Sequence, residues 1–263
     1  GSWNIKIGTI AGRSGLHLGF TGAIKKPLTK SPISKVDAEI LYHSLNTDAL
    51  DPELYTEGQF LVGSIRFEKE WQLSTYKSYY VGSRIKMGDG FVKGSLNSGF
   101  TYRASKKIKT SLFAGLGSFL FSKNIPLQYH YYLSGTVDPD FEHLVIDRMG
   151  GGANNDFKVL HNTYYGSGMR GIVVDNPTIS TDKMFWRVQI DQSFPIFPGK
   201  FFFDIAGGNG FDRQHYAVAG VLLGPVIIPI YQNWENKSKI PDNINWIKNR
   251  LRFMLDLKIP IGR

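Results

Sequence analysis

The sequence contains no cysteine and no long apolar run, and each absence excludes a class of protein. Without cysteine there are no disulfides, no thiol nucleophile and no cysteine-ligated metal. No stretch approaches the roughly 18 apolar residues that a membrane-spanning helix needs, so a helical membrane protein is excluded. The net charge is +9 at pH 7, yet the basic residues are scattered rather than clustered. Scattered charge predicts no nucleic-acid partner. It fits contact with anionic lipid headgroups, with simple solvation of surface charges as the alternative.

The N-terminus shows no pattern of a cleavable signal peptide. Gly1-Ser2 reads as the remnant of a cloning junction, and strand-like sequence begins at once with Trp3. No internal repeat or low-complexity tract marks a boundary. We therefore expect one domain over residues 1–263, either a whole protein or the excised part of a longer one.

Apolar and polar side chains alternate over most of the chain, most clearly near the C-terminus. One set there is apolar: Leu251, Phe253, Leu255, Leu257 and Ile259. The intervening set is mostly charged: Arg252, Met254, Asp256 and Lys258. A helix would mix the two sets around its circumference, whereas a strand separates them onto two faces. The alternation therefore predicts a strand.

The same alternation predicts strands throughout the chain. They lie at about 3–8, 16–21, 36–42, 57–71, 76–88, 91–104, 107–121, 184–196, 199–208, 214–224 and 226–235. With the last segment this gives about twelve strands, an even number, and most segments have the length that a tilted strand needs to cross a bilayer. Short links alternate roughly with longer ones, and aromatic residues often lie at strand ends. These features predict an all-β, antiparallel up-and-down transmembrane barrel in the bacterial outer membrane, with both termini periplasmic. A soluble β-sandwich is the alternative.

The longest link, residues 122–183, is far longer than ordinary connections and indicates a functional loop. Near its start, His130 lies among tyrosines, which predicts an aromatic strand extension above the membrane. Further along it contains Met169-Arg170-Gly171-Ile172. This resembles the Val-Arg-Gly-Phe/Tyr motif in the sixth extracellular loop of the barrels of outer-membrane assembly factors and two-partner secretion transporters. The resemblance implies that the loop folds back into the lumen and that Arg170 contacts acidic residues on the next two strands.

Later segments resemble the same superfamily in the same order. Asp191-Gln192-Ser193-Phe194-Pro195 is similar to the acidic end of the strand after the loop. Phe202-Phe203-Asp204-Ile205-Ala206 is similar to the family's Phe-x-Asp-x-Gly, with Ala206 in place of Gly. Gly224-Pro225-Val226 resembles its Gly-Pro turn. The resemblance covers about residues 107–263, and the earlier strands match only as generic barrel strands.

Alternation places the candidate acidic residues on the inner face without reference to any family. Asp191 shares a face with Arg187 and Gln189, whereas Asp204 shares a face with Phe202 and Ala206. Two neighbouring carboxylates repel each other unless a cation lies between them, and an arginine fork suits that position. We predict that Arg170 bridges Asp191 and Asp204 and holds the loop inside. The alternative is that Arg170 is a solvated loop residue and that Asp191 and Asp204 line a water-filled lumen.

The resemblance implies a barrel that mediates protein insertion or translocation, without enzymatic activity, cofactor or metal. Its partners would be outer-membrane lipid, lipopolysaccharide, client polypeptides and periplasmic domains or lipoproteins, and the barrel would be monomeric. Family barrels commonly have about sixteen strands and the assembly type carries periplasmic domains, so a role as membrane anchor or exit pore of a larger envelope protein is an alternative. A small porin or a phospholipase-like hydrolase is a second alternative. The histidines form no pair with a nucleophile and no metal-binding spacing.

Overall fold

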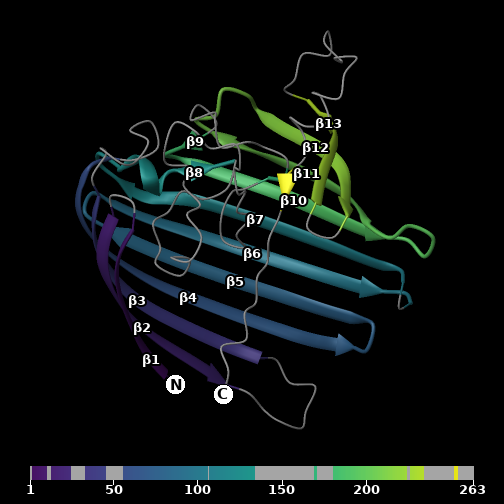
Figure 1. The fold of residues 1–263 in the computed structure, drawn as a ribbon, viewed down its shortest axis with the longest axis horizontal. Coiled ribbons are helices and arrows are strands. Elements are labelled where there is room, and N and C mark those ends of the chain that lie inside the picture. The colour runs from purple at the N-terminus through teal and green to yellow at the C-terminus, as the bar shows by residue number, and fades with distance from the viewer. Residues whose placement is uncertain are drawn as a thin grey trace.

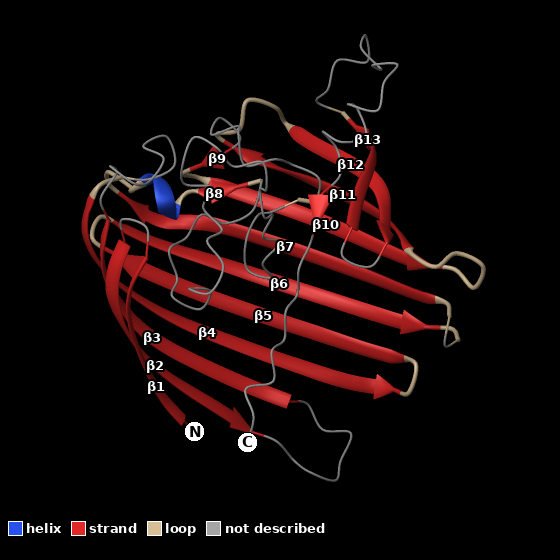
Figure 2. Cartoon of the chain, viewed as in Figure 1, coloured by secondary structure: helices blue, strands red, loops and turns tan. Residues whose placement is uncertain are grey.

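The structure is a computed structural model (Figure 1) that describes residues 2–10, 13–24, 33–45, 56–105, 107–133, 169–170, 180–223, 226–233 and 252–253. Almost everything described is strand, with a single 3-10 turn, η2, at Leu127–Tyr129 (Figure 2). Within these ranges no helix combines the length and the apolar character needed to cross a membrane. The described part of the chain is all-β.

One large antiparallel sheet contains nearly all of the described strands, in the order β1-β2-β3-β4-β5-β6-β7-β10-β11-β12-β13-β14. The bounds are β1 Ser2–Ile10, β2 Arg13–Ile24, β3 Ile33–Leu45, β4 Gly58–Ser74, β5 Lys77–Gly88, β6 Phe91–Arg103, β7 Lys109–Ser122, β10 Met184–Ser193, β11 Lys200–Asn209, β12 His215–Leu223, β13 Val226–Gln232 and β14 Arg252–Phe253. Strands that follow one another in the chain are neighbours in the sheet, except that β8 (Tyr131–Tyr132) and β9 (Ser180–Thr181) pair separately. This is an up-and-down order.

The sheet has an inner face, defined by buried and largely polar residues that alternate along the strands. Its members include Leu41, Val62, Ser64, Lys86, Asn97, Arg187, Phe202 and Asp204. The ribbon curls along its length (Figure 1), and the inward segment η2–β8 packs against this face at Val62 and Phe91. Charged groups on it pair across strands: the guanidinium of Arg66 binds Asp37 at 2.7 Å, and that of Arg84 binds Glu39 at 2.5 Å.

The outer face carries the opposite set of side chains, which are apolar and exposed. Phe100, Leu112, Ile190 and Phe203 are successive cross-strand partners on β6, β7, β10 and β11, and all four are 37–43% exposed. Similar exposed residues continue on the other strands: Trp3, Ile5, Leu18, Ile40, Leu61, Ile65, Ile85, Leu96, Leu116 and Ile230. An apolar face this extensive is unusual for a monomer surrounded by water.

Strand positions follow the alternation closely, but several ends differ from the sequence prediction. The predicted strand 184–196 ends at Ser193, because Pro195 has no N–H to donate to the ladder. The predicted strand 107–121 begins at Lys109, because the hydroxyl of Ser105 accepts hydrogen bonds from the N–H groups of Lys107 and Ile108 and closes a turn first. Of the predicted strand 251–259, only Arg252–Phe253 lies within the described residues, where it pairs with β13.

The prediction of an aromatic strand extension around His130 was wrong for Tyr129, and only Tyr131 and Tyr132 form a strand. Tyr129 ends the 3-10 turn and is fully buried, and Tyr131 and Tyr132 form the short strand β8, also buried. The chain turns inward here because Tyr129 contacts Phe60 and Phe91, with ring centroids 6.1 and 4.7 Å apart. Burial of these rings outweighs their preference for an extended exposed strand.

Candidate functional site

Met169 and Arg170 lie buried against the inner face of β10, β11 and β12. The N–H of Met169 donates to the carbonyl of Leu133 at 2.7 Å, so the chain returns to the point where the inward segment ends. Met169 packs in an apolar cluster on the neighbouring strands, whose other members are Leu133, Phe202, Ala206, Tyr216, Val218 and Leu222. The remaining motif residues, Gly171 and Ile172, lie outside the described residues.

Asp204 is the main partner of Arg170. Its carboxylate accepts the backbone N–H of Arg170 at 2.9 Å and the Nε–H at 3.0 and 2.9 Å, and one terminal guanidinium nitrogen also donates to it. The side chain of Gln189 adds a donor at 3.2 Å. Asp204 is fully buried, and a buried carboxylate needs such a set of donors. Together these bonds fix both the main chain and the side chain of Arg170.

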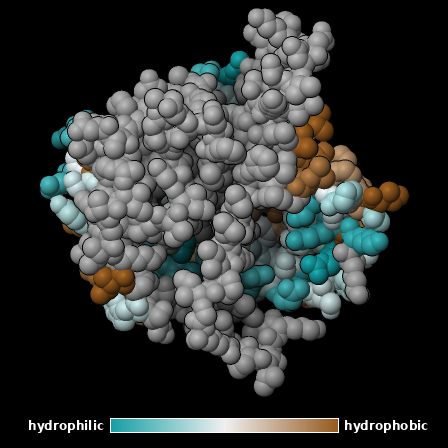
Figure 3. Space-filling view, viewed as in Figure 1, coloured by the Kyte–Doolittle hydropathy of each residue, from teal (hydrophilic) through white to brown (hydrophobic). Residues whose placement is uncertain are grey.

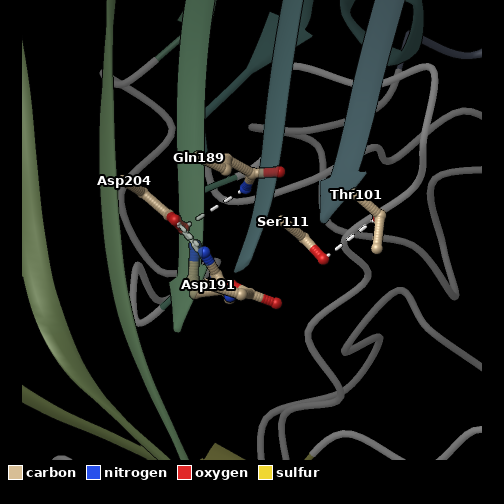
Figure 4. A network of polar contacts seen from close by, with 6 residues as sticks. Thr101, Ser111, Gln189, Asp191 and Asp204 are labelled. Atoms are coloured by element: carbon tan, nitrogen blue, oxygen red, sulfur yellow. Dashed lines mark hydrogen bonds and ion pairs between the residues drawn. The ribbon is translucent and has the colours of Figure 1, made fainter. Parts of the chain in front are cut away.

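The carboxylate of Asp191 accepts a hydrogen bond from the other terminal nitrogen of Arg170, so the guanidinium bridges β10 and β11. Gln189 is the cross-strand partner of Asp204, and Asp191 is that of Phe202, which makes the two carboxylates diagonal neighbours. In Figure 4 a dashed line joins Gln189 on β10 to Asp204 on β11, and Asp191 lies on the same strand as Gln189. The guanidinium carbon lies 4.5 Å from the centre of the Phe202 ring, a cation–π contact. The structure thus brings together Arg170, Asp191, Asp204, Phe202 and Ala206.

A polar row continues from Asp191 along the inner face. Ser111 is the cross-strand partner of Asp191 on β7, and its hydroxyl lies 3.2 Å from that of Thr101 on β6 (Figure 4). Alternation alone places these residues on one face, but it does not give the register that aligns them.

Arg187 is an inner-face residue whose importance the sequence analysis missed. It is 1% exposed, and its guanidinium carbon lies 4.7 Å from the ring centre of Phe113 on β7. Gly115, its cross-strand partner, leaves room for it, since a Cβ there would lie 3.2 Å from its Nε. The only sequence signal was its shared face with Asp191.

A second buried cluster holds the inward segment against β3, β4 and β6. The hydroxyl of Tyr129 lies 2.8 Å from Nε2 of His43, and the ammonium of Lys93 donates to the Tyr129 carbonyl at 2.8 Å. Burial lowers the pKa of the neighbouring His130, against the opposing effect of Asp182. These contacts attach the segment independently of Arg170.

The arrangement can hold a loop in place. One permanent cation lies between two carboxylates, and no nucleophile–base pair is part of the group. Among the described residues there is no cluster of three or more His, Asp or Glu side chains suited to a metal ion.

No protein-family model matches the chain, and no curated protein matches it either. The superfamily resemblance therefore stays a prediction from the motifs.

Proposed function

We propose that this chain is a closed β-barrel of about twelve strands in the bacterial outer membrane, of the assembly and secretion superfamily, in which Met169-Arg170 holds a plug loop in the lumen. The observation that carries the proposal is the contact of Arg170 with Asp191 and Asp204 on the inner face. It ties the long loop between β7 and β10 to the inner face of the two strands that follow the loop, β10 and β11.

The outer face supports the membrane location. Its exposed leucines, isoleucines and phenylalanines run across successive strands and alternate with the polar inner face. Lipid-facing and lumen-facing residues alternate in this way in transmembrane barrels. Closure would join the two margins of the sheet, β1 and β14, and remove the unpaired edges that are costly in lipid.

Protein insertion or translocation is the activity proposed for the barrel. A lumen filled by a loop that ionic contacts hold is a gated passage rather than a permanently open one, because the loop can leave when those contacts break. A porin would need a water-filled lumen, and the inward segment together with Met169 and Arg170 occupies space that such a lumen would require.

The first test is single-channel conductance in planar bilayers for the wild type and Arg170→Ala. We expect small, fluctuating currents from the wild type and larger or noisier ones from the variant, because two carboxylates then repel each other and release the loop. Arg213→Ala is the matched control, since Arg213 is an exposed arginine in the β11–β12 link. Its currents should equal those of the wild type.

The same preparation tests the proposed activity. Proteoliposomes that contain the chain should accelerate the folding of an unfolded outer-membrane barrel added from outside, followed by its altered gel mobility. One large, stable conductance for both wild type and Arg170→Ala would indicate a simple porin. Failure of the wild type to insert at all would favour a soluble β-fold.

A further inference from the structure

The two edges of the sheet differ in charge. We call the edge formed by the β4–β5, β6–β7 and β10–β11 hairpins the turn edge, with residues 68–79, 102–109 and 193–200. Its described cations are Lys69, Lys77, Arg103, Lys107, Lys109 and Lys200, and its acidic residues are Glu68 and Glu70. The opposite edge, with residues 10, 13, 56–57, 88–91, 122–125, 181–184 and 209–215, has the described cations Arg13, Lys123, Lys183 and Arg213 and the acidic residues Glu57, Asp89, Asp182 and Asp212. Positive charge therefore gathers at the turn edge.

Aromatic rings accompany the cations on the outer side of the turn edge. The ammonium of Lys69 lies 4.9 Å from the ring centre of Trp71, and that of Lys77 lies 5.8 Å from that of Tyr102. Trp71 itself lies 5.5 Å from Tyr79, ring centre to ring centre. In Figure 3 hydrophilic and strongly apolar atoms adjoin at the right-hand margin, where these hairpins lie. Aromatic rings and long basic side chains favour the same depth, the boundary between hydrocarbon and headgroups.

A second row of cations lies on the inner side of the same edge. Arg103 is the cross-strand partner of Lys109, the N–H of Lys109 donates to the hydroxyl of Ser193 at 2.9 Å, and Ser193 is the partner of Lys200. The row spans four adjacent strands. The positive electrostatic potential of this inner row adds to that of Lys69, Lys77 and Lys107 on the same edge.

We propose that the turn edge binds the phosphate groups of an anionic phospholipid leaflet, an inference that rests on the proposed membrane barrel. The cations occur on successive hairpins and two of them stack on outer-face rings, so they fit headgroups arranged around a barrel. An acidic protein would instead need one compact basic patch. The described part of the opposite edge has equal numbers of basic and acidic residues and offers no equivalent attraction.

The test compares quenching by two brominated lipids. The chain is folded into vesicles in a form whose only tryptophan is Trp71, and its quenching by brominated phosphatidylglycerol is measured against that by brominated phosphatidylcholine. Each lysine near an anionic surface is worth roughly a fivefold change in partitioning. We expect a clear preference for phosphatidylglycerol that weakens at high salt, because salt screens exposed charges.

Neutralising the turn edge should remove this preference. K69Q/K77Q/K107Q should lower the ratio at least severalfold, toward one, whereas K123Q/K183Q/R213Q removes the same charge from the other edge and should leave it unchanged. If the triple variant does not fold, K77Q/K107Q replaces it in the same measurement. Equal quenching of the inserted wild type by the two brominated lipids would overturn the inference without contradicting the proposed membrane barrel. An equal fall in both variant sets would show an effect of net charge alone and would also overturn it. Failure to insert into either lipid would overturn the inference and the proposed function together.

Discussion

At the residue scale, the two carboxylates that hold Arg170 are not equivalent. Asp204 is fully buried and accepts from the main chain, Nε and a terminal nitrogen of Arg170, and from Gln189. The side chain of Asp191 is 27% exposed and binds one terminal nitrogen. Breaking a buried pair leaves an uncompensated charge, whereas an exposed partner is replaced by water. Asp204 is therefore the stronger attachment.

Substitution of each aspartate by asparagine should distinguish the contributions of Asp204 and Asp191 to stability. Asp204→Asn should lower the free energy of unfolding by about 3 kcal/mol, and Asp191→Asn by about 1 kcal/mol or less. Equilibrium urea unfolding in lipid vesicles, followed by tryptophan fluorescence, measures both. Equal losses would mean that total negative charge, and not the set of bonds to Asp204, holds the segment. Arg170→Lys is a useful companion, because lysine cannot reproduce the fork that spans two carboxylates.

At the element scale, Gly117 on β7 allows β8 to approach the sheet. A Cβ at position 117 would lie 2.3 Å from the ring of Phe185 and 2.9 Å from the hydroxyl of Tyr131, which donates to the carbonyl of Gly94 at 2.9 Å. Gly117→Ala should displace β8 and lower the free energy of unfolding by about 1–3 kcal/mol. Gly94→Ala is the control, since its Cβ would meet only Leu120 at 3.7 Å. An unchanged free energy of unfolding for Gly117→Ala would show that the position of β8 does not depend on this close approach.

How much the sequence predicted also depends on scale. Strand positions followed from alternation, because the side-chain period of a strand is two and most strands here have one polar and one apolar face. Strand ends depended on single residues such as Pro195 and Ser105, which alternation ignores. The inward course of η2–β8 was not predictable, since the residues that bury Tyr129, His43, Phe60 and Phe91, are far from it in the sequence.

The contacts of Arg170 show the same division. The inner-face positions of Asp191 and Asp204 and the need for a cation between these carboxylates could be read from the chain. The register that places Gln189 opposite Asp204, and the ring of Phe113 under Arg187, could not, because both depend on how neighbouring strands are aligned.

At the scale of the whole molecule, the outer face separates a membrane barrel from a soluble β-fold. Leu116 lies at the middle of β7 on this face and is 50% exposed, whereas Ile196 lies in the β10–β11 link and is 98% exposed. In a soluble protein, arginine at either exposed position would change stability little. In a membrane, a charge at mid-depth costs far more than one near the headgroups.

Arginine at these two positions therefore tests the environment of the whole sheet. For protein folded into vesicles, Leu116→Arg should lower the free energy of unfolding by about 2–4 kcal/mol, and Ile196→Arg by about 0–1 kcal/mol. Urea titration of both variants beside the wild type gives the difference, and the two share the same added charge. A small effect at both positions would place Leu116 in water, and the exposed apolar face would then need a protein partner rather than lipid. A large loss of stability for Leu116→Arg alone requires a hydrocarbon environment around the strands. Free sheet edges are costly in hydrocarbon, so this result would also argue for closure between β1 and β14.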